Sequence, residues 1–275
     1  MKLFYAMGGG FGHLVRTHAF IQKMGFLHFR VLTSNPLATR IFKPENLIFL
    51  LASTPQLVSM IQATVLKHAA ASSEVYIDSF PQGILGELGV LAQVGKPLHY
   101  LARRLRWPAY QPMVKSTVLR YDQTFLLEEL EPAHQAWLQT HSKRCLPFSI
   151  TYPSPNTARV KPQIQFPQRP LWIVVHAFHS NEVQQLVNLA ETDAELENQS
   201  PELLVISDQP VDLPTGARLL DDYPAHDWFP LAARIYSGCG FNSFYQLKKY
   251  RQRSILLPFD RKLDDQHWRL RSLTA

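Results

Sequence analysis

The sequence has 275 residues, of which 46% are hydrophobic and 18% are charged, with only two cysteines. This composition excludes a disordered, fibrous or disulfide-stabilised protein. The length suffices for two α/β domains. The formal net charge of +6 arises in the first half, because residues 1–145 hold 15 Lys and Arg against 8 Asp and Glu, a net +7.

No apolar run reaches the roughly 18–20 residues of a membrane-spanning helix, and the glycines from Gly8 interrupt the apolar start that a signal peptide would need. We therefore expect a cytoplasmic protein. The basic first half suits a phosphorylated partner or peripheral contact at the inner membrane face, and a solvated basic surface is the simpler alternative. No basic helix or zinc-finger spacing indicates nucleic acid.

The first half alternates apolar strands with helices. "KLFYAM" (2–7) predicts a strand and "LVRTHAFIQKM" (14–24) a helix. A second helix is predicted after an N-cap at Thr54 and Pro55. Its inward positions recur every three or four residues at Leu57, Met60, Ile61, Thr64, Val65 and His68. Further strands are predicted at 28–34, 46–53, 74–80, 96–103 and 123–130. Such alternation is typical of a parallel, doubly wound sheet.

Six prolines between residues 147 and 170 predict an extended linker. After it, strands are predicted at 171–178, 202–208, 217–222, 234–240 and 254–259, with Ser180 as the N-cap of the intervening helix. The predicted organisation is therefore an N-terminal α/β domain at 1–146, the linker at 147–170 and a C-terminal α/β domain at 171–275.

The first predicted turn contains "GGGFGH", which is Gly8, Gly9, Gly10, Phe11, Gly12 and His13. Glycines between a strand and a helix let a ligand approach the backbone, and the helix start offers unpaired amides. The loop lacks the dinucleotide and P-loop spacings, so a simple tight turn is the alternative. His13, in the first helical turn, is a candidate general base because the pKa of histidine lies near neutral pH.

A second glycine turn follows a strand in the second half. "YSGCGFNSFYQL" places Gly238 and Gly240 before a helix that starts near Asn242 and Ser243. Exposed amides and neutral side-chain donors there favour a phosphate, while a merely capped helix is the alternative. Further on, "DDQHWR" places Asp265 and Gln266 after the last strand, as candidates for holding hydroxyl groups or as a solvated acidic turn.

Taken together, these segments resemble the MurG-like glycosyltransferases of the two-domain GT-B fold. The resemblance rests on "GGGFGH", "YIDSFPQGILGEL", "DDYPAHDWFPLAARIYSGCGFNSFYQL" and "LPFDRKLDDQHWR", in that order. It implies an α/β protein of two Rossmann-like domains with a cleft between them, an acceptor-side domain first and a nucleotide-sugar domain second.

The resemblance also implies a function. A sugar would move with inversion from a nucleoside diphosphate donor, usually UDP-linked, to a hydroxyl acceptor that is lipid-linked or phosphorylated, with no bound metal and no cofactor. His13 would be the base, and Gly9, Gly10 and Gly12 would form the acceptor loop. The donor would be held by Gly238, Gly240, Asn242, Ser243, Gln246, Asp265 and Gln266, and by the backbone near Leu220.

Two alternatives stay open. Gln246 stands where the family has a ribose-binding glutamate, which would suit a protein that holds a nucleotide sugar without turning it over. "GFGHLVR" also resembles the sugar-nucleotide hydrolases of pseudaminic acid synthesis, in which the histidine activates water. If His13 is not the base, Glu87 or Asp78 is the next candidate. "ARRLRWPAY" (102–110) is a candidate patch for the acceptor or the membrane, and an ordinary exposed helix with one half-buried Trp is the alternative.

Overall fold

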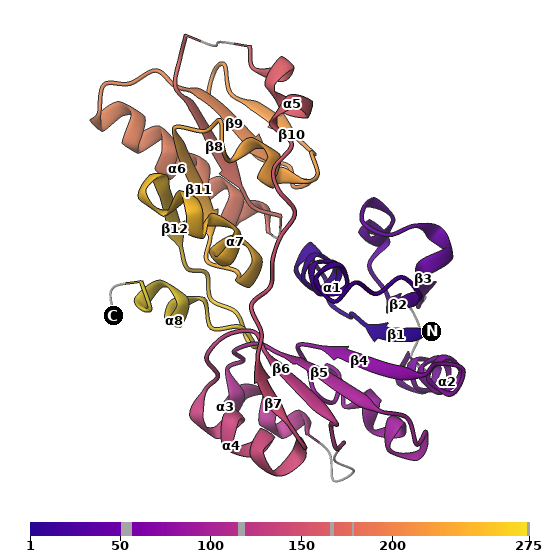
Figure 1. Ribbon diagram of the computed structural model, residues 1–275. Helices are drawn as coiled ribbons and strands as arrows, with labels where there is room; N and C mark the ends of the chain where they lie inside the picture. The colour runs from indigo at the N-terminus through magenta and orange to yellow at the C-terminus, as the bar shows by residue number, and fades with distance from the viewer. Residues whose placement is uncertain (51–56, 115–118, 166–167, 178, 274–275) are drawn as a thin grey trace. The chain divides into compact units, whose positions relative to one another are not determined.

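The computed structural model describes residues 1–50, 57–114, 119–165, 168–177 and 179–273. The chain forms two compact units. Unit 1 comprises Met1–Thr151 and Lys262–Asp265, and unit 2 comprises Tyr152–Arg261 and Gln266–Ala275. In each unit the strands form one sheet with helices beside it (Figure 1).

The sheet of unit 1 has seven parallel strands in the order β3-β2-β1-β4-β5-β6-β7. The strands are β1 Lys2–Tyr5, β2 Phe29–Thr33, β3 Leu47–Phe49, β4 Glu74–Asp78, β5 Leu98–Ala102, β6 Gln123–Leu126 and β7 Cys145–Pro147. The α-helices are α1 Phe11–Lys23, α2 Leu57–Ala70, α3 Trp107–Tyr110 and α4 Pro132–His141. Short 3₁₀ helices are η1 Pro36–Arg40, η2 Pro44–Asn46, η3 Glu87–Gln93 and η4 Gln111–Met113.

Alternate residues of these strands are buried on opposite faces of the sheet. Leu3 packs in one cluster with Ile61 and Val65 of α2, whereas its neighbour Phe4 meets Phe20 of α1 at a ring-centroid distance of 6.3 Å. Because successive strand side chains point to opposite faces, one apolar strand can pack under helices on both sides.

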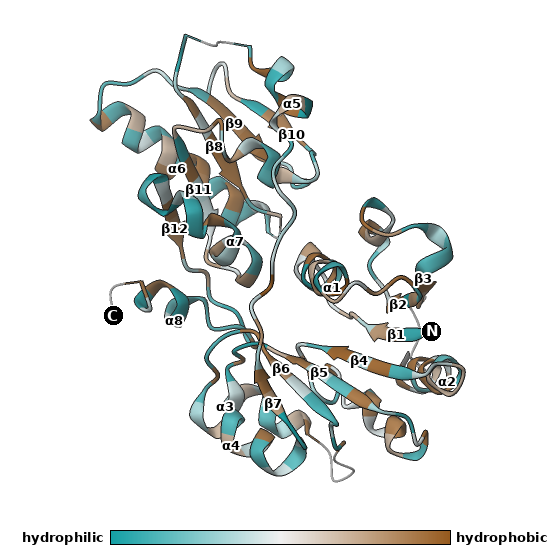
Figure 2. Cartoon of the chain, viewed as in Figure 1, coloured by the Kyte–Doolittle hydropathy of each residue, from teal (hydrophilic) through white to brown (hydrophobic). Residues whose placement is uncertain are grey.

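Unit 2 has a five-stranded parallel sheet in the order β10-β9-β8-β11-β12. Its strands are β8 Leu171–Val175, β9 Glu202–Ile206, β10 Arg218–Leu220, β11 Arg234–Gly238 and β12 Ser254–Leu257. Its helices are α5 Thr157–Val160, η5 Lys161–Gln163, α6 Ser180–Leu196, η6 Ala225–Trp228, α7 Phe241–Gln246, η7 Leu247–Arg253 and α8 Gln266–Arg271. The central strands β8 and β9 are strongly apolar (Figure 2), as expected where helices cover both faces.

Both sheets contain a topological switch point. In unit 1 the strand order reverses direction between β1 and β4, and in unit 2 it reverses between β8 and β11. In open α/β sheets, ligands bind beside the carboxyl ends of the strands at this point. The fold therefore marks two places at which a ligand-binding site is expected, one in each unit.

The structure confirms the α/β prediction and the parallel sheets, and it corrects several details. Met60 is exposed, although the helical spacing placed it in the inward stripe. The region 147–170, expected as an extended linker, contains α5 and η5, and Val160 of α5 is fully buried in unit 2. The predicted N-cap at Thr54 and Pro55 lies outside the described residues.

The segment Lys262–Asp265 also differs from the predicted division, because it belongs to unit 1. Asp264 forms an antiparallel bridge with Leu105, and the Arg106 amide donates a hydrogen bond to the Leu263 carbonyl at 3.2 Å. Backbone pairing between residues so distant in sequence leaves no local pattern. Across the described part of the chain, no helix is both long and apolar enough to span a membrane.

Candidate active site

His13 lies in the first turn of α1, directly after the glycine loop that follows β1. A Cβ added to Gly8 would fall 2.1 Å from Cδ2 of His13 and 2.5 Å from its Nε2. The imidazole thus lies directly against the loop backbone, which is possible only because residue 8 has no side chain. Gly8 is therefore a steric requirement for the position of His13.

Asp78, the last residue of β4, holds the other edge of the ring. The His13 Nδ1 lies 2.6 Å from Oδ2 of Asp78. Arg16, one turn further along α1, donates from Nε to Oδ1 and from Nη2 to Oδ2 of the same carboxylate, each at 2.6 Å. Because β1 and β4 are neighbours, their carboxyl ends bring these three side chains together at the switch point of unit 1.

Ser79 supports this cluster from the next position in the chain. It has a φ of +66°, in the left-handed region that few residues other than glycine adopt. Its hydroxyl accepts hydrogen bonds from Arg16 and, at 2.9 Å, from Nε of Arg103. Its carbonyl accepts one from the Tyr100 hydroxyl at 2.6 Å. These bonds hold an unfavourable backbone conformation that turns the chain sharply after Asp78.

The charges of the cluster fix the protonation of His13. Burial opposes the ionisation of Asp78, but the Arg16 guanidinium and the His13 hydrogen bond outweigh it and hold the pKa of Asp78 well below its usual range. Asp78 is therefore a carboxylate and a hydrogen-bond acceptor, so Nδ1 of His13 carries the proton. Burial lowers the pKa of His13, although Asp78 acts in the opposite direction. At neutral pH the ring is uncharged and its Nε2 has a free lone pair.

This arrangement is that of an oriented general base. The carboxylate selects one tautomer and stabilises the imidazolium that forms when Nε2 takes a proton. Among the described residues, the hydrogen-bonding contacts of this ring are made by Nδ1, and no partner of Nε2 is present. The sequence analysis predicted His13 as the base, named Asp78 only as a substitute base and did not name Arg16. The signal for Asp78 was its place at the end of "YID", a buried strand beside the first.

The structure gives a steric role to one glycine of the loop that was not among the predicted acceptor-loop residues. The glycines singled out were Gly9, Gly10 and Gly12, yet Gly8 is the one that the histidine requires. A Cβ on Gly9 would meet nothing within 4 Å. Gly10 is the N-cap residue of α1, and Gly12 lies within the first turn. A role for Gly9, Gly10 and Gly12 in binding the acceptor stays a prediction.

Glu87, the other substitute base, has a structural role. It is buried, and it accepts hydrogen bonds from the Tyr5 hydroxyl and from the amides of Ile84 and Leu85, the latter at 3.2 and 2.7 Å. Gly83 has a φ of +82°, and a Cβ there would lie 2.2 Å from the Glu87 carboxyl carbon. Glu87 thus fixes the loop after β4.

The predicted donor residues of unit 2 cluster around the end of β11. Gly238 ends the strand, Gly240 is the N-cap residue of α7, and the amide oxygen of Asn242 accepts a hydrogen bond from the Tyr152 hydroxyl at 2.9 Å. Ser243 and Gln246 are half-buried in α7. This helix has only six residues, so its dipole is weaker than the sequence analysis assumed.

Two other predicted donor residues, which are adjacent in the chain, belong to different units. Asp265 belongs to unit 1, where Nε of Arg104 lies 3.2 Å from its Oδ2. Gln266 belongs to unit 2, is buried, and accepts a hydrogen bond from the Phe259 amide at 3.0 Å. The Leu220 carbonyl accepts one from the Ser207 amide at 2.9 Å. Their contacts with a donor stay predictions, and each already makes a bond within its own unit.

The segment "ARRLRWPAY" does not form the exposed patch that its composition suggested. Arg103 pairs with Asp264 and Arg104 pairs with Asp265. Trp107 and Tyr110 are buried at 1% and 0% exposure, and of the three arginines only Arg106 is exposed. Acidic partners from residues 264–265 thus neutralise much of the positive charge counted in this stretch.

No protein-family model and no curated protein sequence matches this chain. Solved structures do match it. A glycosyltransferase from Streptomyces nogalater is 13% identical with a TM-score of 0.57, over 100% of this chain and 85% of that one. Phytolacca americana UGT2, complexed with UDP-2-fluoro-glucose and pterostilbene, is 15% identical with a TM-score of 0.59, over 100% of this chain and 83% of that one.

A second kind of enzyme has the same architecture. The UDP-GlcNAc 2-epimerase of Methanocaldococcus jannaschii is 9% identical with a TM-score of 0.56, over 100% of this chain and 92% of that one. Identities this low establish shared architecture and leave activity to be argued from the site. The chain therefore has the fold of these enzymes, the GT-B fold of two Rossmann-like units.

Proposed function

We propose that the protein is a glycosyltransferase that moves a sugar from a nucleoside diphosphate donor, most simply a UDP-sugar, to a hydroxyl acceptor. The observation that carries this proposal is the 2.6 Å contact between Nδ1 of His13 and Asp78 at the switch point of unit 1. The matching structures include a complex with UDP-2-fluoro-glucose and pterostilbene. An oriented, uncharged imidazole is the group that such an acceptor hydroxyl requires.

In this mechanism Nε2 of His13 takes the proton of the acceptor hydroxyl as its oxygen attacks the anomeric carbon. The bond from that carbon to the diphosphate oxygen breaks, and the electron pair leaves with the diphosphate. Asp78 stabilises the positive charge that appears on the imidazole, and Arg16 keeps Asp78 ionised. A single direct displacement inverts the anomeric centre. The proposed reaction needs no metal, because hydrogen-bond donors would meet the growing charge on the diphosphate.

For the acceptor, we propose a phosphorylated or lipid-linked alcohol. The support is the net +7 charge of residues 1–145, which favours an anionic partner. The pairing of Arg103 and Arg104 with Asp264 and Asp265 moves the expected contact away from 102–110. Peripheral contact with the inner membrane face belongs to this proposal.

The test begins with binding of the full chain to a panel of nucleoside diphosphate sugars, measured by calorimetry. We expect UDP-sugars to bind, and absence of binding across the panel would overturn the proposal. The bound donor is then incubated with and without an acceptor extract. Transfer predicts that the donor stays intact without the extract, and that the free nucleoside diphosphate and a glycosylated acceptor appear once the extract is added.

Two other outcomes have their own support. The same His13–Asp78 pair would deprotonate water, so rapid release of free sugar without an acceptor would identify a hydrolase. Gln246 offers an uncharged amide for the ribose, so tight binding without turnover in either condition would identify a binding protein.

A further inference from the structure

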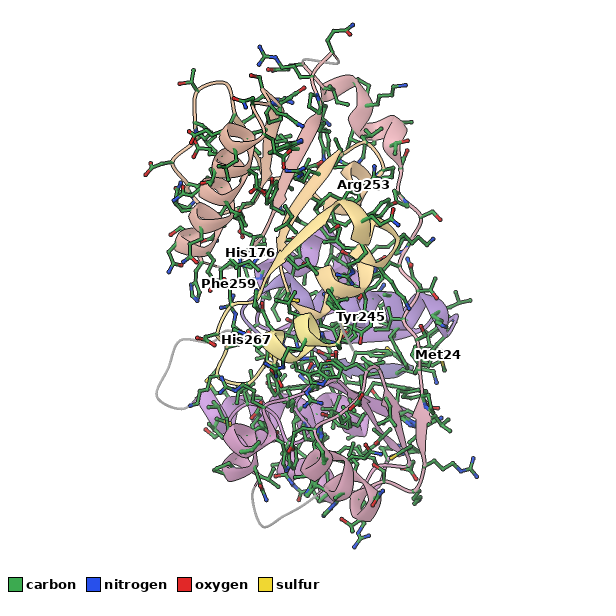
Figure 3. The ribbon with its side chains drawn as sticks, turned by 90° about the vertical axis from the view of Figure 1, so that its left-hand side faces the viewer. Met24, His176, Tyr245, Arg253, Phe259 and His267 are labelled. Carbon is green, nitrogen blue, oxygen red and sulfur yellow. The ribbon has the colours of Figure 1, made fainter. Side chains whose placement is uncertain are left out.

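A second histidine lies at the switch point of unit 2, in a cluster that the proposed mechanism has not used. His176 directly follows β8, and its Nε2 lies 2.7 Å from Oε2 of Glu182, in the first turn of α6. Arg261 donates to both oxygens of this carboxylate. Phe259 packs on the imidazole at a ring-centroid distance of 5.1 Å, and both rings are labelled in Figure 3.

The glycine that ends β11 is fitted to this histidine. A Cβ on Gly238 would lie 2.7 Å from Cε1 and 2.8 Å from Nδ1 of His176. The Nδ1 edge of the ring therefore rests over the Gly238 backbone, between the carboxyl ends of β8 and β11. The strand order reverses at this pair of strands, which is where a ligand of such a sheet binds.

The carboxylate fixes which nitrogen is available. Burial opposes the ionisation of Glu182, but the Arg261 and His176 hydrogen bonds outweigh it and lower its pKa. Glu182 is thus an acceptor, so Nε2 of His176 carries a proton and donates. Among the described residues, the hydrogen bond of this ring is made by Nε2, and Nδ1 has no hydrogen-bond partner.

The charged and titratable groups that face His176 come from three segments. Glu182 belongs to α6, Arg261 follows β12, and His179 precedes α6. Burial lowers the pKa of His176, Glu182 opposes that change, and Arg261 and His179 add to it. Because Arg261 already neutralises Glu182, a second proton on the imidazole has no compensating charge in the free protein. An anion at Nδ1 would supply that charge.

We propose that His176 binds the diphosphate of the sugar donor through Nδ1, in its doubly protonated form, with Glu182 as the positioning residue. The inference rests on the proposed function and adds to it that donor binding takes up a proton. Nδ1–H donates to a phosphate oxygen while Nε2–H donates to Glu182. The positive imidazole then meets the charge that grows on the diphosphate as the sugar leaves.

The experiment measures proton uptake on donor binding. UDP-glucose and TDP-glucose are the probes, because both ends of their diphosphate are esterified and neither titrates near neutral pH. The full chain carries His13→Ala to prevent turnover. Calorimetry at pH 8 in two buffers of different ionisation enthalpy gives the number of protons taken up, and titrations from pH 8.5 to 6.5 give the pH dependence of Kd.

We expect uptake of up to one proton for each donor bound, with affinity rising about tenfold for each unit by which pH falls, until the free imidazole itself becomes charged. His176→Gln keeps an amide donor near Glu182 but has no titrating nitrogen. It should lose the proton uptake and bind at least about tenfold more weakly at pH 6.5. The matched control is His267→Gln, the same change at an exposed histidine of unit 2 that pairs with Asp260, and it should match the parent.

Failure of this inference differs from failure of the proposed function. If the parent binds a donor but His176→Gln binds with the same affinity and the same proton uptake, His176 does not contact the diphosphate and only the inference is overturned. If the parent binds neither these probes nor any other member of the panel of nucleoside diphosphate sugars, both are overturned. A circular dichroism melt of His176→Gln separates loss of binding from loss of folding, and a folded variant that keeps proton uptake rejects the inference.

Discussion

The two units place similar clusters at equivalent points of their sheets but hold the histidine by opposite nitrogens. In unit 1, Asp78 engages Nδ1 of His13, and in unit 2, Glu182 engages Nε2 of His176. An arginine neutralises each carboxylate, and a glycine lies under each ring. The available nitrogen is therefore Nε2 in unit 1 and Nδ1 in unit 2.

The origin of the carboxylate explains this difference. Asp78 ends a strand next to the one that precedes His13, whereas Glu182 lies in the helix that follows His176 in the chain. The carboxylate therefore approaches each ring from a different side. In our proposals, the unit 1 histidine takes a proton from the acceptor, and the unit 2 histidine keeps its second proton and donates it in a hydrogen bond to the donor diphosphate. The following experiments test that division.

The largest expected effect is that of His13→Ala. Removing the base should reduce turnover by about 10³- to 10⁴-fold and leave donor affinity nearly unchanged, because the proposed donor contacts lie in unit 2. Steady-state rates and calorimetric Kd values of the same preparation measure the two effects. A variant with normal turnover would show that the base is another residue, and the contrast between the units would then fail.

Asp78→Asn should reduce turnover by about 10²- to 10³-fold, because an amide can stabilise the wrong tautomer of His13. It also leaves Arg16 buried without a carboxylate, which should cost about 3–5 kcal/mol of folding free energy. Denaturant titration measures the second effect. Nitrogen NMR of wild-type His13 is the companion test should the variant not fold, and a proton found on Nε2 instead of Nδ1 would contradict this assignment.

Substituting the two contact glycines should produce different defects. Gly8→Ala places a Cβ 2.1 Å from the His13 ring, so we expect turnover to fall about tenfold or more while donor affinity is kept. Gly238→Ala places one 2.7 Å from the His176 ring, so donor affinity and its pH dependence should fall. A denaturant titration of each variant controls for folding stability. Identical defects in the two contact variants would argue against separate roles.

The last comparison is the response of the two units to pH, which should have opposite signs. Burial lowers the pKa of His13 below its ordinary 6.5, and a base must be uncharged, so kcat at saturating donor should fall only as pH drops through that lowered value. Donor affinity should change in the other direction and rise as pH falls, because the bound form of His176 is protonated. Rates and Kd values measured from pH 5 to 8.5 test both signs, and a parallel change in the two quantities would mean that one group governs both.

Much of the fold followed from local patterns in the sequence. The apolar runs "KLFY", "EVYID" and "LWIVV" became β1, β4 and β8, because buried parallel strands need continuous apolar residues. The glycines after β1 and β11 likewise lie between a strand and a helix, as their spacing predicted. The helix α4 and the edge strand β7 were missed, since neither has a strong period in the sequence.

Contacts between distant residues were decided by the tertiary structure alone. Asp78 is 65 residues from His13, Arg261 is 79 from Glu182, and Asp265 is 161 from Arg104. A sequence pattern records what one residue needs from its own strand or helix. Which side chains meet depends on strand order, and strand order is set by the packing of the whole sheet.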